Sequence, residues 1–207
     1  MSLTRRKVKS LTRDQATYRD DRIFWVGTDD RYAPKQYLDF LKVKRVRIFT
    51  LAAEERTQAA REVVQRLKAA EEIQEQDQVW ALLDADHYDQ GRHLPSFLEA
   101  LRGAWDAGIQ VAISKPCFEV WLLLHYEDAA AVEGLATAAE VEACLRKAIG
   151  EYNKRQLKRE HYPEDRVGLA MARARELDGG VGGGEIPQSA TTRVYQLLEA
   201  IGVGLIK

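Results

Sequence analysis

The sequence predicts an α/β fold in which a largely parallel sheet is sandwiched by helices and followed by a helical C-terminal region. Three observations predict it. Short apolar runs alternate with helix-length segments over the first 128 residues, which is the pattern of β-α-β units. Strands separated by such segments need crossover connections and therefore pair in parallel. After residue 128 the strand signals stop and only helical patterns follow.

Four segments carry the strand pattern. The first, DRIFWVGT, is rich in β-forming residues and has a glycine near its end, so it predicts a buried strand. The third, QVWALLD, is apolar until its last residue, as expected for a strand buried on both faces of a parallel sheet. The strands are expected at residues 21–28, 45–52, 78–84 and 109–114.

Helices are expected between and after these strands. Pro34 suits the first turn of the first helix, and Gly108 suits the end of the third. Apolar residues at helical spacing mark a buried face in each segment, for example Val63, Val64 and Leu67 in the second. The helices of this part are expected at residues 34–43, 53–73, 94–108 and 116–126.

The region after residue 128 is expected to contain helices at residues 141–149, 151–160 and 168–177. The stretch GGVGGG follows a predicted helix and lacks the Lys-Ser/Thr ending of a phosphate loop, so we expect a flexible linker there. A last helix should begin near Ser189. The chain therefore divides into a basic N-terminal arm (1–20), an α/β core (21–128) and a helical region packed on that core (129–207).

The composition is that of an ordinary globular protein, with 45% hydrophobic and 30% charged residues and a formal net charge of −1. No apolar run approaches the roughly 20 residues that cross a bilayer, so we expect no membrane partner. Two cysteines make neither a disulfide framework nor a zinc cluster, and we expect a cytoplasmic location. The basic arm is either a solvated segment or a phosphate-contacting one. The oligomeric state is left open.

Acidic residues follow the first and third strands at the points where these strands end. Asp84 and Asp86 end the third strand, and Asp29 and Asp30 follow the first. Ligands of open parallel sheets bind outside the carboxyl ends of the strands, and neighbouring strands lie about 4.8 Å apart. The four carboxylates would then form a pocket for one or two Mg²⁺ or Mn²⁺ ions, which prefer oxygen ligands. The alternative is that these aspartates cap the helices that follow.

Glu119 lies in an apolar segment, PCFEVWLLLHY, that predicts a buried helix. It shares a helix face with Leu122, Leu123 and Tyr126, where a glutamate is costly unless it meets a cation, a metal or several donors. We expect either a site residue near the aspartates or a salt bridge to an arginine of the helical region. Lys115, which ends the fourth strand, would contact phosphate or balance the acids, unless it is simply solvated.

Three segments resemble the RloB-like family, and the resemblance spans most of the chain. AISKPCFEVWLLLHYE (112–127), which contains Glu119 and His125, is similar to the family's Ser-Asn-Pro-Cys-Phe-Glu segment. LLDADHYD (82–89) is similar to its strand-ending Asp-x-Asp, and ATTRVYQLLEAI (190–201) resembles its C-terminal segment. The family includes AbiL-type components of bacterial phage abortive-infection operons, often encoded beside an ATPase.

The resemblance implies a Toprim-related, Rossmann-like core. In such a core a glutamate after the first strand and an Asp-x-Asp after the third bind Mg²⁺ for phosphodiester chemistry. Asp84 and Asp86 match the paired acids. The chain departs from the family in VGTDDRYAPKQYL, which places Asp29 at the position of the glutamate, and in Lys115, which replaces the asparagine before proline.

Two hypotheses of function follow. The first is a Mg²⁺-dependent phosphodiesterase, a nuclease of a phage-defence system that acts on DNA or RNA. The second is a non-catalytic protein that docks to a neighbouring ATPase through its helices. A small nucleotide-binding domain is less favoured, because no phosphate-cradling glycine loop follows the first strand. The residues expected to carry catalysis are Asp29, Asp84, Asp86, Glu119 and Lys115.

Overall fold

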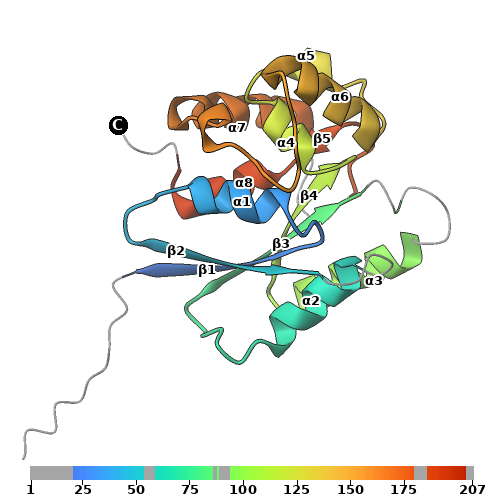
Figure 1. Ribbon diagram of the computed structural model, residues 1–207. Coiled ribbons are helices and arrows are strands. Elements are labelled where there is room, and N and C mark those ends of the chain that lie inside the picture. The colour runs from blue at the N-terminus through green and yellow to red at the C-terminus, as the bar shows by residue number, and fades with distance from the viewer. Residues whose placement is uncertain (1–20, 54–58, 86–87, 89–93, 180–185, 204–207) are drawn as a thin grey trace, which may run out of the picture.

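A five-stranded sheet with helices on both faces forms the centre of the molecule (Figure 1), which confirms the predicted α/β fold. The computed structural model describes residues 21–53, 59–85, 88, 94–179 and 186–203. The spatial order is β2-β1-β3-β4-β5, in which β1 to β4 are parallel and β5 is antiparallel to β4. The strands are β1 (Arg22–Thr28), β2 (Val46–Ala52), β3 (Gln78–Asp84), β4 (Gln110–Lys115) and β5 (Thr191–Thr192).

The helices form two layers. Helices α2 and α3 cover one face of the sheet, whereas α1 and the helices after β4 lie on the other (Figure 1). Among the described residues, no helix has both the length and the hydrophobicity needed to span a membrane. The helices are α1 (Ala33–Phe40), α2 (Ala59–Ala69), α3 (Leu94–Asp106), α4 (Glu119–Leu123), α5 (Ala129–Val132), α6 (Ala138–Ile149), α7 (Glu164–Asp178) and α8 (Val194–Ile201), with a 3-10 turn η1 (Arg159–His161).

Successive residues of β3 pack into separate cores on the two faces of the sheet. Trp80 and Leu82 join the core beneath α1 and α4, and Ala81 and Leu83 join the core beneath α2 and α3. This is the alternation that a strand imposes on its side chains, and it explains why the strand is apolar without interruption. By the same alternation, Asp84 belongs to the face that carries α1 and α4.

The connections create a switch point between β1 and β3. From β1 the chain crosses through α1 to β2 at the edge of the sheet, and from β2 it crosses through α2 to β3 on the other side of β1. Right-handed crossovers that run in opposite directions place their helices on opposite faces, as observed here. Ligands of open parallel sheets bind where the strand order reverses in this way. The ends of β1 and β3 are therefore the favoured place for a site.

The helix predicted at residues 151–160 is wrong. Gly150 ends α6 with a φ of 79°, and the chain then runs as a loop as far as η1. The Asn153 side chain accepts a hydrogen bond from the backbone N–H of Arg155 at 3.0 Å, a local turn that competes with helix formation. We call residues 150–158 the α6–η1 loop.

Several other predicted boundaries differ from those observed. Helix α1 ends at Phe40 and α2 ends at Ala69, each earlier than predicted. Helix α4 begins at Glu119 rather than at Pro116, because the preceding residues form tight i→i−3 turns. The last helix begins at Val194, because the two threonines before it pair with β4 as the unpredicted strand β5. The N-terminal arm and residues 180–184 of the glycine stretch lie outside the described residues.

Gly27 permits the close approach of α2 to the centre of the sheet. A Cβ atom at this position would lie 2.6 Å from Cγ1 of Val63 and 2.8 Å from Cδ1 of Leu67. Both side chains are buried in a packed core, so they can shift only by displacing their neighbours. Gly27 also lies three residues before Asp30, so a shift of Gly27 would move the turn that carries this carboxylate.

We expect Gly27→Ala to destabilise the fold by about 1–3 kcal/mol, because the added methyl group must displace α2. Gly168→Ala is the matched control: Gly168 lies in α7, and a Cβ there would meet nothing within 4 Å. Removing a helical glycine should stabilise the protein by up to about 1 kcal/mol. Urea unfolding of the two variants checks both signs, and equal stability of Gly27→Ala and the parent would refute the packing argument.

Candidate active site

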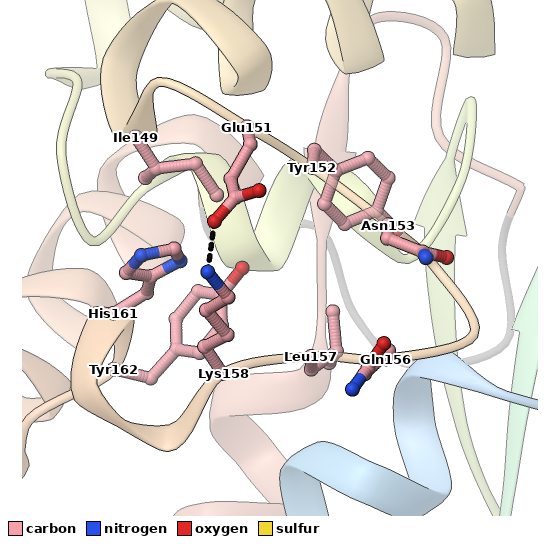
Figure 2. A pocket seen from close by; sticks show the side chains of 9 residues that line it. All are labelled: Ile149, Glu151, Tyr152, Asn153, Gln156, Leu157, Lys158, His161 and Tyr162. Atoms are coloured by element: carbon pink, nitrogen blue, oxygen red, sulfur yellow. Dashed lines mark hydrogen bonds and ion pairs between the residues drawn. The ribbon is translucent and has the colours of Figure 1, made fainter.

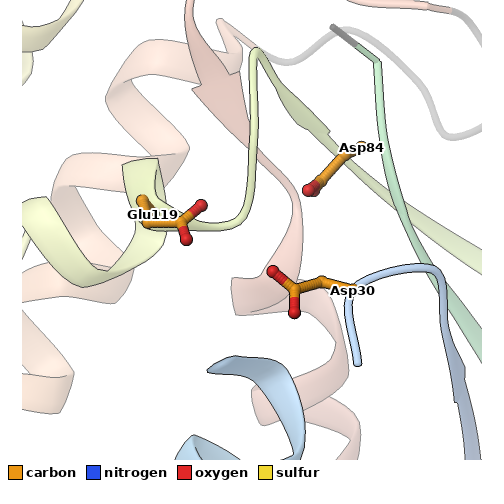
Figure 3. A group of neighbouring side chains, drawn as sticks. All are labelled: Asp30, Asp84 and Glu119. Atoms are coloured by element: carbon orange, nitrogen blue, oxygen red, sulfur yellow. The ribbon is translucent and has the colours of Figure 1, made fainter. Parts of the chain in front are cut away.

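Three carboxylates converge at the carboxyl end of the sheet (Figure 3). Asp30 comes from the turn after β1, Asp84 from the end of β3 and Glu119 from the first residue of α4. One oxygen of each lies within 4.8 Å of the others. Asp30 and Glu119 are buried, whereas Asp84 is half-buried.

The pairing register of β1 and β3 explains why Asp30 meets Asp84. Thr28 is the partner of Leu82 in this parallel pair. Two residues further along each chain lie Asp30 and Asp84, so extending the register places them side by side. The turn after β1 is also tied to β3, because the backbone N–H of Asp29 donates to the carbonyl of Leu82 at 3.4 Å.

The two oxygens of Asp30 have separate partners. Oδ1 accepts hydrogen bonds from the backbone N–H groups of Tyr32 and Ala33, at 2.7 and 3.3 Å, at the start of α1. Oδ2 lies 2.5 Å from Nζ of Lys154. Asp30 thus satisfies N–H groups at the start of α1, whose N-cap residue is Tyr32, and it also joins the acidic group.

Glu119 is almost completely buried, with 1% of its surface exposed, and its partners come from the α6–η1 loop. The hydroxyl of Tyr152 donates to Oε1 at 2.6 Å, and Nζ of Lys154 lies 3.6 Å from the same oxygen. The sequence suggested either a place near the aspartates or an arginine partner. The structure places Glu119 near the aspartates, with a lysine rather than an arginine beside it.

The surrounding pKa values reflect this concentration of negative charge. Burial alone would lower the pKa of Lys154, but the carboxylates of Glu119 and Asp30 outweigh it and raise that pKa above its usual value. Burial, followed by the charge of Glu119, raises the pKa of Tyr152 and that of Cys117. Tyr152 and Cys117 are therefore neutral at physiological pH, and Lys154 is a cation.

The other predicted site residues lie around this group. The carboxylate of Asp29 accepts a hydrogen bond from the backbone N–H of Asp84 at 2.7 Å and is not one of the three that converge. Lys115 ends β4 as a half-buried residue and pairs with Thr191 of β5. Asp86 lies outside the described residues.

Sequence reasoning did not identify Tyr152 and Lys154. The segment that contains them predicted a helix, whereas the structure has a loop there. The two residues lie 33 and 35 positions after Glu119, and no pattern in the sequence gives that contact. Gly150 and Asn153, both typical of turns, were the available signal that residues 151–160 do not form a helix.

The α6–η1 loop is held in place by its own contacts and by Gln36 of α1. Its Glu151 and Lys158 form an ion pair beside a cavity of about 110 Å³ that is lined partly by Tyr152 and Tyr162 (Figure 2). The Gln36 side chain donates to the carbonyl of Lys154 and accepts from the N–H of Leu157, both at 2.9 Å. Gln36 thus fixes the backbone that presents Lys154 to the acids.

His125 is part of an aromatic cluster and not of the acidic group. Nδ1 lies 3.0 Å from the carbonyl of Trp121, which can only accept, so Nδ1 carries the proton. Nε2 then accepts from the hydroxyl of Tyr37 at 3.2 Å. The rings of Trp121, Tyr37 and Tyr162 meet the imidazole edge to face. Burial lowers the pKa of His125 to about 4, so the ring is neutral at physiological pH.

The fold and the site define a class of protein: an α/β protein with three carboxylates at the switch point of its parallel sheet. Comparison with family models then identifies the family to which the protein belongs. The model of the RloB-like proteins matches residues 24–201, which is most of the chain, and the protein belongs to that family. Searches of curated proteins and of solved structures found no match.

We expect Gln36→Ala to loosen the α6–η1 loop, because two hydrogen bonds to its backbone are lost. The amide of Leu157 should exchange with solvent about tenfold faster, the equivalent of one hydrogen bond. Hydrogen exchange of the native protein measures this directly. Lys35→Ala, which removes a neighbouring exposed ion pair with Asp39, should leave the exchange unchanged. If the Leu157 amide exchanges equally fast in both variants, Gln36 does not hold the α6–η1 loop in place.

We also expect His125 to contribute to acid unfolding. Its pKa is lowered from 6.5 to about 4 in the folded protein, so between these values the unfolded chain binds a proton that the folded one does not. The stability it supports is complete above pH 6.5 and is lost as the pH falls towards 4, by about 2–3 kcal/mol. In urea unfolding at pH 7.0 and 4.5, His125→Gln should show a correspondingly smaller loss, and an unchanged loss would contradict the assignment.

Proposed function

We propose that this protein is a Mg²⁺- or Mn²⁺-dependent phosphodiesterase that cleaves nucleic acid. The observation that carries the proposal is the convergence of Asp30, Asp84 and Glu119 at the switch point of a parallel sheet. Like charges repel, so a protein that buries two carboxylates beside a third needs cations among them. Lys154 supplies one positive charge to the two buried carboxylates, Asp30 and Glu119.

The donor set fits a hard divalent cation. All three ligands offer oxygen, which Mg²⁺ and Mn²⁺ prefer, and no sulfur or imidazole takes part. Ligands on opposite sides of Mg²⁺ lie about 4.2 Å apart, at two bonds of about 2.1 Å each. The oxygens lie within 4.8 Å of one another, so small side-chain movements bring them into reach.

Each neighbouring residue has a role in this proposal. Asp30, Asp84 and Glu119 hold the cation, and Asp29 fixes the backbone of Asp84. Tyr152 orients Glu119 through its hydrogen bond. A bound cation would supply Lewis-acid stabilisation of charge on a phosphate and lower the pKa of a water molecule.

Three further residues complete the proposal. Lys154 balances the acids before a cation binds and is then available to a phosphate. We retain Asp86 as a further ligand, on its sequence position two residues after Asp84, and Lys115 as a phosphate contact, on its place at the end of β4. In this proposal the acid supplied by the β1 turn is Asp30 rather than Asp29. The family pattern, which has a glutamate after the first strand and an Asp-x-Asp after the third, supports the chemistry.

The resemblance also supports a biological setting. We place the activity in a bacterial phage-defence system of the abortive-infection type, with a Toprim-related core. The free thiols of Cys117 and Cys144 suit the reducing cytoplasm. The nucleic acid would be met there, with a neighbouring ATPase as the partner that controls access to it.

A second candidate function, docking to such an ATPase without catalysis, is favoured by the outer face of α3. Leu94, Leu98 and Trp105 lie on one side of this helix, at helical spacing, and Trp105 is 53% exposed. Exposed apolar side chains that share a face are typical of protein interfaces. The two functions are compatible, because α3 lies on the face of the sheet opposite α4 and Glu119.

Binding of the cation to the folded state should raise thermal stability, by about 2.7 kcal/mol at a concentration 100 times its Kd. We expect Mn²⁺ or Mg²⁺ to raise the Tm of the parent protein and to have no such effect on Asp84→Asn. The substitution keeps the size of the side chain and removes its charge. The same variant should lose at least a hundredfold in metal-dependent cleavage of DNA or RNA.

Asp106→Asn is the matched control, because Asp106 is an exposed aspartate at the end of α3. Its metal response should equal that of the parent. Differential scanning fluorimetry over a metal titration gives the shifts, and gel assays give the cleavage. A metal response or a cleavage rate that survives in Asp84→Asn would reject the proposed function.

A further inference from the structure

A groove opens directly beside the acidic group. It has a volume of about 450 Å³ and runs between the start of α1, helix α6 and the α6–η1 loop. Tyr152 and Lys154 line it and also contact the acids, through Glu119 and through both Glu119 and Asp30 respectively. A molecule in this groove therefore lies next to the three carboxylates. Its volume is within the range of about 300–1,000 Å³ that small organic ligands occupy.

One wall of the groove is an aromatic platform. Tyr32 is half-buried and its backbone is fixed on both sides, because its N–H donates to Asp30 and its carbonyl accepts from Gln36 at 2.9 Å. The guanidinium of Arg155, an exposed residue, lies 5.3 Å from the centre of the Tyr32 ring. A planar cation on an aromatic ring marks a face that can stack a planar group. Aromatic rings and arginine side chains that line a groove bind nucleobases in this way.

The charge of the groove suits a phosphate chain. Three cations line it, Arg146, Lys154 and Arg155, against one acid, Glu142, which is paired with Arg146 at 2.6 Å. The acidic group beside the groove is negative, so the two parts have opposite preferences. A cation fits the carboxylates, and an anion fits the groove.

We propose that the groove binds an unpaired nucleotide of the substrate, with its base stacked on Tyr32 and its phosphate contacted by Arg155 and Lys154. The inference deepens the proposed function and rests on it, since it assigns the substrate class of the same site. A base inside a duplex is already stacked on both faces and cannot reach Tyr32. The substrate is thus a single-stranded nucleic acid or the unpaired end of a strand.

The test is equilibrium binding without divalent metal, so that no cleavage occurs. Fluorescence anisotropy in EDTA would use labelled dT12, labelled U12 and a labelled 12-base-pair duplex. We expect tighter binding of a single strand than of the duplex. Tyr32→Ala should weaken it by about fivefold to a hundredfold, as loss of one stacked base does, and Tyr32→Phe should preserve it. Arg155→Ala should also weaken binding of the single strand. It should reduce the magnitude of the slope of log Kobs against log salt concentration by about 0.7.

Two matched controls lie away from the groove. Phe49→Ala removes an exposed aromatic ring of β2, and Arg102→Ala removes an exposed arginine of α3. Neither should change binding. Thermal unfolding identifies any variant that has lost its fold, and Tyr32→Phe then carries the test. The ratio of dT12 to U12 affinity decides between DNA and RNA, and binding of either supports the groove.

The inference is overturned if Tyr32→Ala binds single strands like Phe49→Ala, or if the duplex binds as tightly as the single strands. This failure differs from failure of the proposed function. Loss of binding in Tyr32→Ala together with no metal-dependent cleavage by the parent would retain the groove and reject the phosphodiesterase. Cleavage that depends on Asp84 but not on Tyr32 would retain the phosphodiesterase and reject the groove.

Discussion

The parallel register of β1 and β3 is the constraint on which the rest of the site depends. It pairs Thr28 with Leu82 and thereby brings Asp30 beside Asp84. A slip of one residue would turn the acids and the apolar residues of one strand to the opposite faces. The register is secured by packing on both faces, because each strand has apolar residues in both cores, and by Gly27, which lets α2 approach the sheet.

Burying carboxylates that share one location costs free energy, and the structure shows what offsets it. Asp30 is held by two backbone N–H groups and by Lys154, and Glu119 by Tyr152 and the same lysine. A surface ion pair contributes little, but Asp30 and Glu119 are almost fully buried and Lys154 is partly buried, so solvent screens their attraction less. The ammonium of Lys154 carries one positive charge for the two buried carboxylates of Asp30 and Glu119, and the proposed cation would supply more beside them.

The strands were predictable because their signal is local. Short apolar runs fixed β1 to β4 to within about a residue, and the place of Asp84 at the end of β3 followed from the run itself. The choice between Asp29 and Asp30 was not predictable, because it depends on how the turn after β1 folds against β3 and α1. The α6–η1 loop was missed for a related reason: its backbone hydrogen bonds go to Gln36, more than 100 residues away, and no local pattern encodes them.

The site residues come from segments that are far apart in the sequence. The carboxylates come from β1, β3 and α4, but the lysine and tyrosine that satisfy them come from a loop after α6. Without that loop, Glu119 would be a buried carboxylate with neither of these partners, which is strongly unfavourable. The region after residue 128 is therefore needed for the arrangement of the acidic group as well as for the packing. The same loop places Arg155 beside the ring of Tyr32. The loop that provides the partners of Glu119 therefore also forms part of the groove.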